Sequence, residues 1–369
     1  MNRVAYLDGI RAMAIAGVLA VHWIASQFPA VYGGYIGVDI FFVLSGYIIT
    51  SMLWRKRSAD PIPRQYGRFL WRRVVRLYPA LTVFVVVTLV IYAVFPGAPM
   101  SPSDLAFPAL VALGQGYSIY AGSGAAEATP FAITWSLSVE WMFYVLWPLA
   151  IFAARRRGLE ARRVARWSAA IAVVLYLVAL FQDSHWFYYG PLARVPEIMV
   201  GGVLALLIHA SAAQAGRAAR SGLSPKVLPA LAILSIAFIG LYTLFGPVQW
   251  SPVFRFVGLP LTVAATAYLI WFGQRLPDSR LTALLGWGPA AFLGRISYSL
   301  YLWHMVGLNL FTRDNMGDLP LLVVAGLSVG LAVCLAGLSY RFLERPFLRS
   351  RASVLRDGSK GPVPSLTKS

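Results

Sequence analysis

Apolar runs of about twenty residues recur along the whole chain, and short polar segments separate them. The hydrocarbon core of a bilayer requires a helix of about 20 mostly apolar residues. The pattern therefore predicts ten transmembrane helices, at about 7–25, 37–54, 79–95, 134–153, 167–182, 191–209, 227–245, 253–272, 289–311 and 319–340. Around 104–121 the pattern is weaker and fits either a half-helix or an extra span. We expect an all-α, polytopic integral membrane bundle of about ten transmembrane helices.

The composition favours a membrane protein over a soluble one. Charged residues make up 12% of the chain, against roughly 25% in a typical soluble domain. The single cysteine, Cys334, provides neither a disulfide framework nor a cysteine metal site, and the four histidines are dispersed, so we expect no bound metal. The sequence also lacks a GxSxG elbow, a Walker A loop, a GxGxxG turn and an HExxH helix.

The chain carries a formal net charge of +18, and the positions of its basic residues predict its orientation. On a soluble protein this charge indicates nucleic acid binding, but membrane proteins gather Lys and Arg on the cytoplasmic side. With a cytoplasmic N-terminus, all 32 Lys and Arg residues except Arg194, Arg255 and Arg313 lie in internal segments or inner helix halves. We therefore expect cytoplasmic N- and C-termini, membrane lipid as a partner and no nucleic acid. The domain boundaries follow as a transmembrane domain at 1–345 and a basic, flexible cytoplasmic tail at 346–369.

Two ionisable residues of the first predicted helix are candidate functional groups, because charge inside a bilayer is costly. Arg11 and His22 are eleven residues apart, almost three turns, so they share a helix face at a separation of about 16 Å. Asp8 precedes Arg11 by one turn and can pair with it. The alternative is that Arg11 snorkels toward the cytoplasm and His22 lies at the outer interface. In the functional interpretation, His22 faces an internal cavity and not lipid.

Two carboxylates also lie in apolar spans. Asp39 is near the outer end of the second span, where it reaches His22 and fixes the imidazole tautomer if helices one and two are antiparallel neighbours. Its alternative role is to cap the helix start. Glu140 lies inside the fourth span on the same face as Ser136 and requires a partner, which in a structural role is an arginine.

Further polar residues are candidates for a cavity wall. Ser45 lies at mid-membrane in the second span, where Ser45 and Gly46 also favour close helix packing. Tyr298 and Tyr301 of the ninth span fit either a polar cavity or an aromatic interface belt. His304 is a second candidate imidazole, although a lone histidine is more often structural.

The segment 64–79 carries a basic stripe. Arg68, Arg72 and Arg76 recur every four residues, and Arg73 lies beside them. Three interpretations compete: an anchor on anionic lipid, an amphipathic interfacial helix, and a site for a phosphorylated ligand, because guanidinium groups match phosphate geometry. The pattern alone favours the first two.

Taken together, these segments resemble the acyltransferase-3 family of integral membrane O-acyltransferases. The match begins with YLDGIRAMAIAGVLAVHW, in which Arg11 and His22 form the family's R-x10-H arrangement. It continues in the family's order with GGYIGVDIFFVLSGYIIT, RFLWRRVVRLYPAL, TWSLSVEWMFYVLWP, ISYSLYLWH and ERPF, over nearly the whole chain. Each motif alone is weak, whereas the ordered set is specific. We expect the stand-alone form of the family, without an added SGNH domain.

The resemblance implies a function at the bacterial plasma (inner) membrane. An acyl group, expected to be acetyl, passes from cytoplasmic acyl-CoA to a hydroxyl of a carbohydrate-type acceptor at the outer face. Acyl-CoA, here acetyl-CoA, is then a co-substrate, and no bound cofactor is expected. Acceptor choice is expected to reside in outer loops, chiefly 96–133.

The resemblance also implies roles for single residues. His22 matches the essential histidine, Arg11 its basic partner and Glu140 the acidic residue of an S-x-E segment. His22 acts either as the base or as a covalent acyl carrier, and Glu140 or Asp39 orients its imidazole. The donor-binding candidates are Arg68, Arg72, Arg73 and Arg76, of which the last three match the family's internal arginine cluster.

Two alternatives remain at this point. Buried His, Glu and Arg residues also suit a transporter or flippase for a glycan or small polar substrate. Inverted repeats or paired broken helices would support transport, and the sequence shows neither. The acceptor can also be a macrolide or another secondary metabolite instead of a glycan.

Overall fold

The computed structural model describes residues 4–24, 31–55, 58–95, 98, 100–125, 129–214, 227–311, 317 and 319–346. Within these ranges the regular elements are all helices, and the predicted all-α, polytopic membrane bundle is confirmed. The predicted tail at 346–369 lies outside the described residues except for its first residue.

Each of the ten predicted spans coincides with a helix in the described part of the chain. The long helices are α1 (Ala5–Leu19), which continues into η1 (Ala20–Ile24), α2 (Ile36–Arg55), α3 (Ile62–Val94), α6 (Trp135–Arg156), α7 (Ala161–Ala179), α9 (Pro191–Gln214), α10 (Val227–Phe245), α11 (Leu259–Arg275), α13 (Gly288–Leu310) and α15 (Leu321–Ser339). Eight of these described helices have the length and apolar composition to cross a membrane. The other two are α7, whose first half carries three arginines, and α13, whose polar side chains include site residues described below.

The weakly patterned segment near 104–121 forms two short helices instead of a continuous span. These are α4 (Pro102–Leu113) and α5 (Tyr117–Gly122), and Gln115 between them has a left-handed φ of 57°. At 1.5 Å per residue, α4 is about 18 Å long, well short of the roughly 30 Å hydrocarbon core. The other short elements are η2 (Tyr32–Tyr35), η3 (Ala132–Thr134), α8 (Ser184–Tyr189), η4 (Phe254–Gly258), α12 (Arg280–Leu285) and η5 (Tyr340–Glu344).

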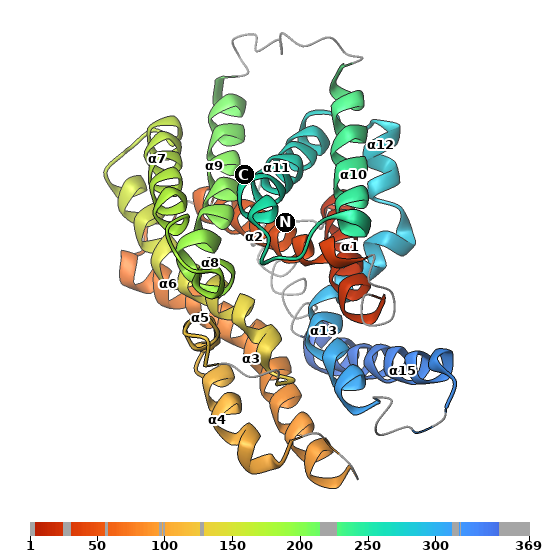
Figure 1. Cartoon of the computed structure of the whole chain (residues 1–369). Coiled ribbons are helices and arrows are strands. Elements are labelled where there is room, and N and C mark those ends of the chain that lie inside the picture. The colour runs from red at the N-terminus through yellow and green to blue at the C-terminus, as the bar shows by residue number, and fades with distance from the viewer. Residues whose placement is uncertain are drawn as a thin grey trace, which may run out of the picture.

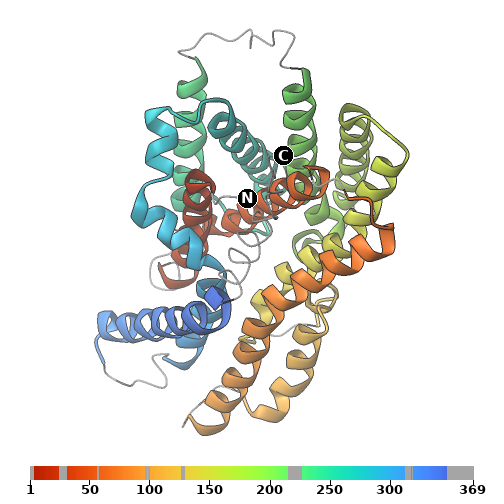
Figure 2. The ribbon, with the colours of Figure 1, turned by 180° about the vertical axis from the view of Figure 1, so that it is seen from behind.

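Helices α1 and α2 lie at the centre of the molecule, as both views show (Figure 1, Figure 2). Helix α2 packs against α9, and α1 packs against α13, which also contacts α15. The approach of α2 to α9 depends on glycine: a Cβ at Gly46 would lie 1.7 Å from the Ile198 carbonyl oxygen, and one at Gly201 would lie 2.0 Å from that of Val43. The close packing predicted at Gly46 is therefore confirmed.

The bundle has two ends that matter for function. Helix α2 has 20 residues and is about 30 Å long. His22 lies beside Tyr35, the residue directly before the start of α2. Its last residues instead lie beside the basic half of α3. Helix α3 is a single helix of 33 residues that joins the basic stripe to the predicted third span (Figure 1). We call the two ends the histidine end and the arginine end.

Candidate active site

A pair of imidazoles occupies the histidine end. The ring centroids of His22 and His304 are 4.9 Å apart, and the Tyr35 ring packs on His22 at 5.8 Å. His22 lies in η1, a π-helical turn, which is a rare geometry that occurs frequently at functional sites. His304 comes from α13 and is completely buried. The fold therefore brings together two histidines that are far apart in sequence, and the His22 ring packs against protein groups.

Backbone carbonyls fix the tautomer of both imidazoles. Nδ1 of His22 lies 2.7 Å from the Val18 carbonyl oxygen, and Nδ1 of His304 lies 2.7 Å from the Tyr301 carbonyl oxygen. A carbonyl only accepts, so each Nδ1 carries the proton and each Nε2 presents a lone pair. Nε2 of His304 is buried and has no hydrogen-bond partner among the described residues. Each ring thus offers a basic nitrogen at this end of the bundle.

The prediction that Asp39 contacts His22 is wrong, because Asp39 pairs with Arg194. The Asp39 carboxylate accepts from Nη1 of Arg194 at 2.8 Å, and the same nitrogen donates to Glu197 at 2.8 Å. All three side chains are buried, and the Arg194 guanidinium also lies 4.6 Å from the centroid of the Tyr188 ring. Asp39 pairs with arginine because a buried carboxylate requires a cation, whereas a neutral imidazole provides none.

This triad is not among the predicted contacts, in which Arg194 figures only as a basic residue at an outer helix end. The available signal was that Arg194 and Glu197 stand one turn apart near the start of an apolar span, where charges require partners. Since the Arg194 partner on α2 is Asp39, the triad ties α9 to α2.

Glu140 lies at the centre of a second polar cluster. Its Oε2 accepts from the Tyr144 hydroxyl at 2.7 Å, and that hydroxyl lies 3.1 Å from Oγ of Ser45. The guanidinium groups of Arg11 and Arg76 attract the carboxylate electrostatically. Glu140 therefore has the cationic neighbours that its burial demands, from α1 and α3, and it does not orient the His22 imidazole.

Two other contacts, one of them predicted, complete this cluster. Nη1 of Arg11 lies 3.4 Å from Oδ1 of Asp8, so the predicted pair one turn apart is confirmed. The Tyr298 hydroxyl donates to the Leu77 carbonyl oxygen at 2.9 Å, and its phenol interacts electrostatically with Arg76. Tyr298 thereby ties α13 to the basic half of α3.

Tyr301 connects the Glu140 cluster to the imidazoles. Its hydroxyl lies 2.8 Å from Oγ of Ser136, which is one turn from Glu140 on α6. Its ring centroid is 5.6 Å from that of His304. The tyrosine is buried, so this link runs through the interior of the bundle.

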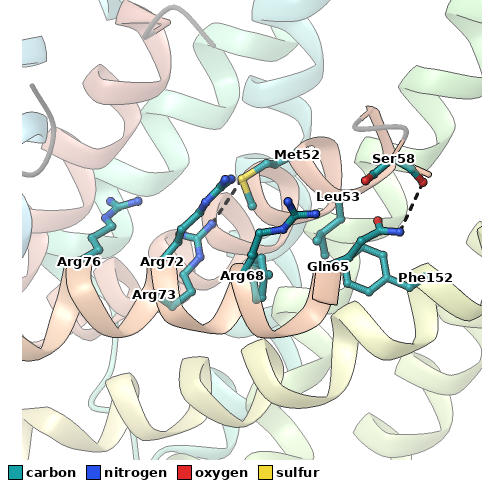
Figure 3. Close-up of a pocket in the computed structure, with 10 residues that line it drawn as sticks. Met52, Leu53, Ser58, Gln65, Arg68, Arg72, Arg73, Arg76 and Phe152 are labelled. Carbon is teal, nitrogen blue, oxygen red and sulfur yellow. Dashed lines mark hydrogen bonds between the residues drawn. The ribbon is translucent and has the colours of Figure 1, made fainter. Parts of the chain in front are cut away.

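The four predicted donor-binding arginines line one pocket at the arginine end (Figure 3). The pocket has an empty volume of about 600 Å³, part of it open to the surface. Its lining residues are Met52, Leu53, Ser58, Gln65, Arg68, Phe69, Arg72, Arg73, Arg76 and Phe152. Arg73 is buried, and its guanidinium lies 5.1 Å from the centroid of the Phe69 ring and 5.3 Å from that of Tyr144. A pocket lined by four guanidinium groups suits a ligand with several phosphates.

One carboxylate offsets part of this charge. Asp60 hydrogen-bonds Ser58 and Arg68 and lies 3.8 Å from Nη1 of Arg64. The hydrogen bond from Ser58, followed by that from Arg68, holds the pKa of the Asp60 carboxyl below its usual value. Asp60 is therefore an anion at neutral pH and competes with any phosphate for Arg68.

The arginine pocket and the imidazole pair are separate places. The lining of the pocket includes neither His22 nor Arg11. A series of polar side chains nevertheless links the arginine pocket to the imidazole pair. Each member contacts the next or lies one helical turn from it, and we call this series the polar path. Its members, in order, are Arg73, Tyr144, Glu140, Ser136, Tyr301, His304 and His22.

A helical membrane bundle with a cationic pocket at one end and an imidazole pair at the other has the features of a membrane acyltransferase. A family model described as an acyltransferase domain matches residues 4–339. The chain belongs to the acyltransferase-3 family of membrane O-acyltransferases, as its motifs predict.

The chain is also similar to named bacterial proteins. YrhL of Bacillus subtilis is 30% identical over 353 residues, which cover 92% of this chain and 54% of YrhL. The O-acetyltransferase OatA of Staphylococcus aureus is 30% identical over 364 residues, covering 92% of this chain and 56% of OatA. The peptidoglycan O-acetyltransferase OatA of Listeria monocytogenes is 29% identical over 360 residues, covering 93% of this chain and 56% of that protein. The chain thus spans about half the length of these relatives. No solved structure matches it.

Proposed function

We propose that this chain transfers an acetyl group from cytoplasmic acetyl-CoA to a hydroxyl of a carbohydrate acceptor at the outer face of the bacterial plasma membrane. The observation that carries the proposal is the polar path, which joins a phosphate-compatible pocket at one end of the bundle to two basic imidazole nitrogens at the other. The peptidoglycan in the names of two relatives favours a glycan over a macrolide as the acceptor.

The arginine pocket is the proposed donor site. Arg72, Arg73 and Arg76 bind the phosphates of CoA, while Arg68 is shared with Asp60. Because basic residues concentrate on the cytoplasmic side of membrane proteins, the arginine end faces the cytoplasm, where CoA occurs. The extended pantetheine arm then carries the thioester into the bundle while the nucleotide stays in the pocket.

His22 is the proposed reactive residue. Its Nδ1–H is held by the Val18 carbonyl, so Nε2 is the nitrogen that acts on the acceptor or on the thioester. Glu140, flanked by Arg11 and Arg76, lines the route along which the thioester approaches. His304 packs on His22, and because its own Nδ1–H is held by the Tyr301 carbonyl, its Nε2 offers a second basic nitrogen beside the reactive one.

Two chemical routes are compatible with this geometry. In the direct route, His22 Nε2 takes the proton of the acceptor hydroxyl, the oxygen attacks the thioester carbonyl, and the C–S bond breaks. The CoA thiolate leaves and takes up the proton. In the covalent route, Nε2 attacks the thioester first, the C–S bond breaks, and CoA leaves as the thiolate. The acceptor oxygen then attacks the acyl-imidazolium, the C–N bond breaks, and the hydroxyl proton passes to the CoA thiolate. Both routes convert one thioester and one alcohol into one ester and one thiol.

The test compares the purified chain with two histidine variants in CoA release from acetyl-CoA with a glycan acceptor. His22→Ala is expected to lower turnover by about 10²- to 10⁴-fold, the usual contribution of a positioned acid or base. His209→Ala is the matched control, because this histidine packs on Trp54 at the arginine end of α2, and its turnover is expected to stay near wild type. Wild-type turnover in His22→Ala would overturn the catalytic assignment. Uptake of labelled sugar without CoA release would favour the transporter alternative.

A further inference from the structure

Aromatic side chains gather beside the imidazole pair at the histidine end. We define the aromatic cluster by its members, which are Tyr35, His185, Tyr188, Tyr189 and Trp250. They come from three segments that are remote in sequence, namely η2, α8 and the connection between α10 and η4. The fold thus assembles one group of rings next to His22.

Ring-to-ring contacts run from His22 through this cluster. The Tyr35 ring centroid is 5.8 Å from that of His22 and 6.1 Å from that of Tyr188. Tyr188 is in turn 5.4 Å from Trp250, whose ring lies 5.0 Å from His185. Because each step is a direct ring contact, the cluster is continuous with the reactive histidine.

Exposure increases along the same series. Tyr188 is buried, Tyr35 is partly exposed, and Trp250 and His185 are exposed, with Trp250 38% accessible. The exposed rings of Trp250 and His185 are packed against each other at an inclination of 35°, so the pair presents an exposed aromatic surface. Such a surface suits the C–H face of a pyranose ring, which is apolar, while the sugar hydroxyls point to the rim.

A polar side chain that can bind a sugar hydroxyl also lies beside the aromatic cluster. The side-chain amide of Gln249 faces the Tyr35 hydroxyl, and its carbonyl oxygen is buried without a hydrogen-bond partner among the described residues. A buried acceptor without a partner is unfavourable in the free protein, so a hydroxyl that reaches it is bound favourably. An amide oxygen beside a tryptophan is a combination that recognises a sugar better than a lipid tail.

We propose that the aromatic cluster and Gln249 bind a sugar ring of the acceptor glycan and present one of its hydroxyls to His22. This inference rests on the proposed function and names the acceptor site, whereas the predicted place of acceptor choice was chiefly 96–133. The opposing interpretation is an aromatic belt at the membrane interface. A belt faces lipid around the bundle, whereas these rings converge on one histidine, and Gln249 has no role in a belt.

The test uses tri-N-acetylchitotriose as the acceptor probe with the full chain in detergent. Binding is followed by saturation-transfer NMR, and transfer by the acceptor and donor KM values. Trp250→Ala is expected to raise the acceptor KM about tenfold, with the acetyl-CoA KM unchanged, and Trp250→Phe to recover most of the loss because it keeps a ring. Gln249→Ala is expected to raise the acceptor KM about tenfold as well, through the lost hydrogen bond.

The matched control is Trp287→Ala, which removes an exposed tryptophan outside the cluster, next to the first residue of α13. It is expected to leave both KM values unchanged. The proposal is overturned if wild-type protein does not bind the trisaccharide, or if Trp250→Ala and Trp287→Ala behave alike. If Trp250→Ala and Gln249→Ala leave acceptor binding unchanged while His22→Ala abolishes CoA release, only the proposed sugar site is refuted, and the proposed function stands. Equal CoA release by wild type and His22→Ala overturns the proposed function itself.

Discussion

Replacing Arg194 by methionine tests whether the buried triad supports the fold or takes part in the reaction. Arg194 pairs with Asp39 and Glu197 at 2.8 Å each, and all three side chains are at most 2% exposed. Removing one partner of a buried ion pair costs about 3–5 kcal/mol, because the remaining charge stays buried without compensation. Here two carboxylates lose their cation, so the upper part of this range is expected. A protein domain has only about 5–15 kcal/mol of net stability, so the loss is severe.

The assay is thermal unfolding of the detergent-solubilised protein, followed by tryptophan fluorescence. Arg194→Met is expected to melt far below wild type, and the triple variant that adds Asp39→Asn and Glu197→Gln to recover much of the loss, because no charge then remains buried. Asp39→Asn alone keeps the Arg194–Glu197 pair and is expected to retain both the fold and most of the CoA release. Two results would refute the reasoning: an Arg194→Met protein as stable as wild type, or a stable Asp39→Asn protein without transfer activity, which would return Asp39 to catalysis.

Substitutions at Arg72, Gly46 and Tyr301 test the donor pocket, the packing of α2 on α9 and the polar path in turn. Arg72→Gln removes one guanidinium from the pocket and is expected to raise the acetyl-CoA KM about tenfold in steady-state kinetics. The melting temperature is expected to stay unchanged. An unchanged KM would contradict the donor site. Gly46→Leu forces a side chain into the Ile198 carbonyl and is expected to destabilise the protein by at least about 1–3 kcal/mol, or to prevent folding; normal thermal unfolding would contradict the close packing of α2 on α9. Tyr301→Phe removes the hydrogen bonds of its hydroxyl with Ser136 and with the Ile133 carbonyl and is expected to cost about 1–3 kcal/mol of stability. A greater loss would indicate a larger role in the polar path.

The helices could be predicted from the sequence because a bilayer imposes a fixed length on an apolar span. The predicted range 227–245 coincides with α10, and the other nine spans lie on helices of the structure. Helix α3 shows the limit of this approach. The basic stripe and the third span form one helix of 33 residues, but the change in composition in the middle suggests two elements.

The residue types of the site could also be predicted, but their pairing could not. Arg68, Arg72 and Arg76 recur every four residues, so the spacing in sequence fixes their common helix face at the pocket. Arg73 stands beside them and reaches the same pocket from its buried wall. The partner of Asp39 lies 155 residues away and depends on how α2 packs against α9, which spacing does not reveal.

The same limit applies to the imidazoles. A contact between His22 and His304, from the first and ninth spans, requires the packing of α1 on α13. The Val18 carbonyl that holds the His22 ring depends on local geometry at a π-helical turn, and no side-chain pattern marks it. Carboxylates were expected in this role because they are the side chains that usually orient a histidine.

In the proposed reaction, an acetyl group of CoA bound at the arginine end reaches an acceptor at the histidine end along the polar path. Sealed proteoliposomes with the chain in one orientation test it most directly, with radiolabelled acetyl-CoA supplied only on the arginine side and an impermeant glycan acceptor only on the histidine side. Labelled glycan is expected on the histidine side and free CoA on the arginine side, with both lost in His22→Ala. Labelled glycan formed only when donor and acceptor share one side would contradict it.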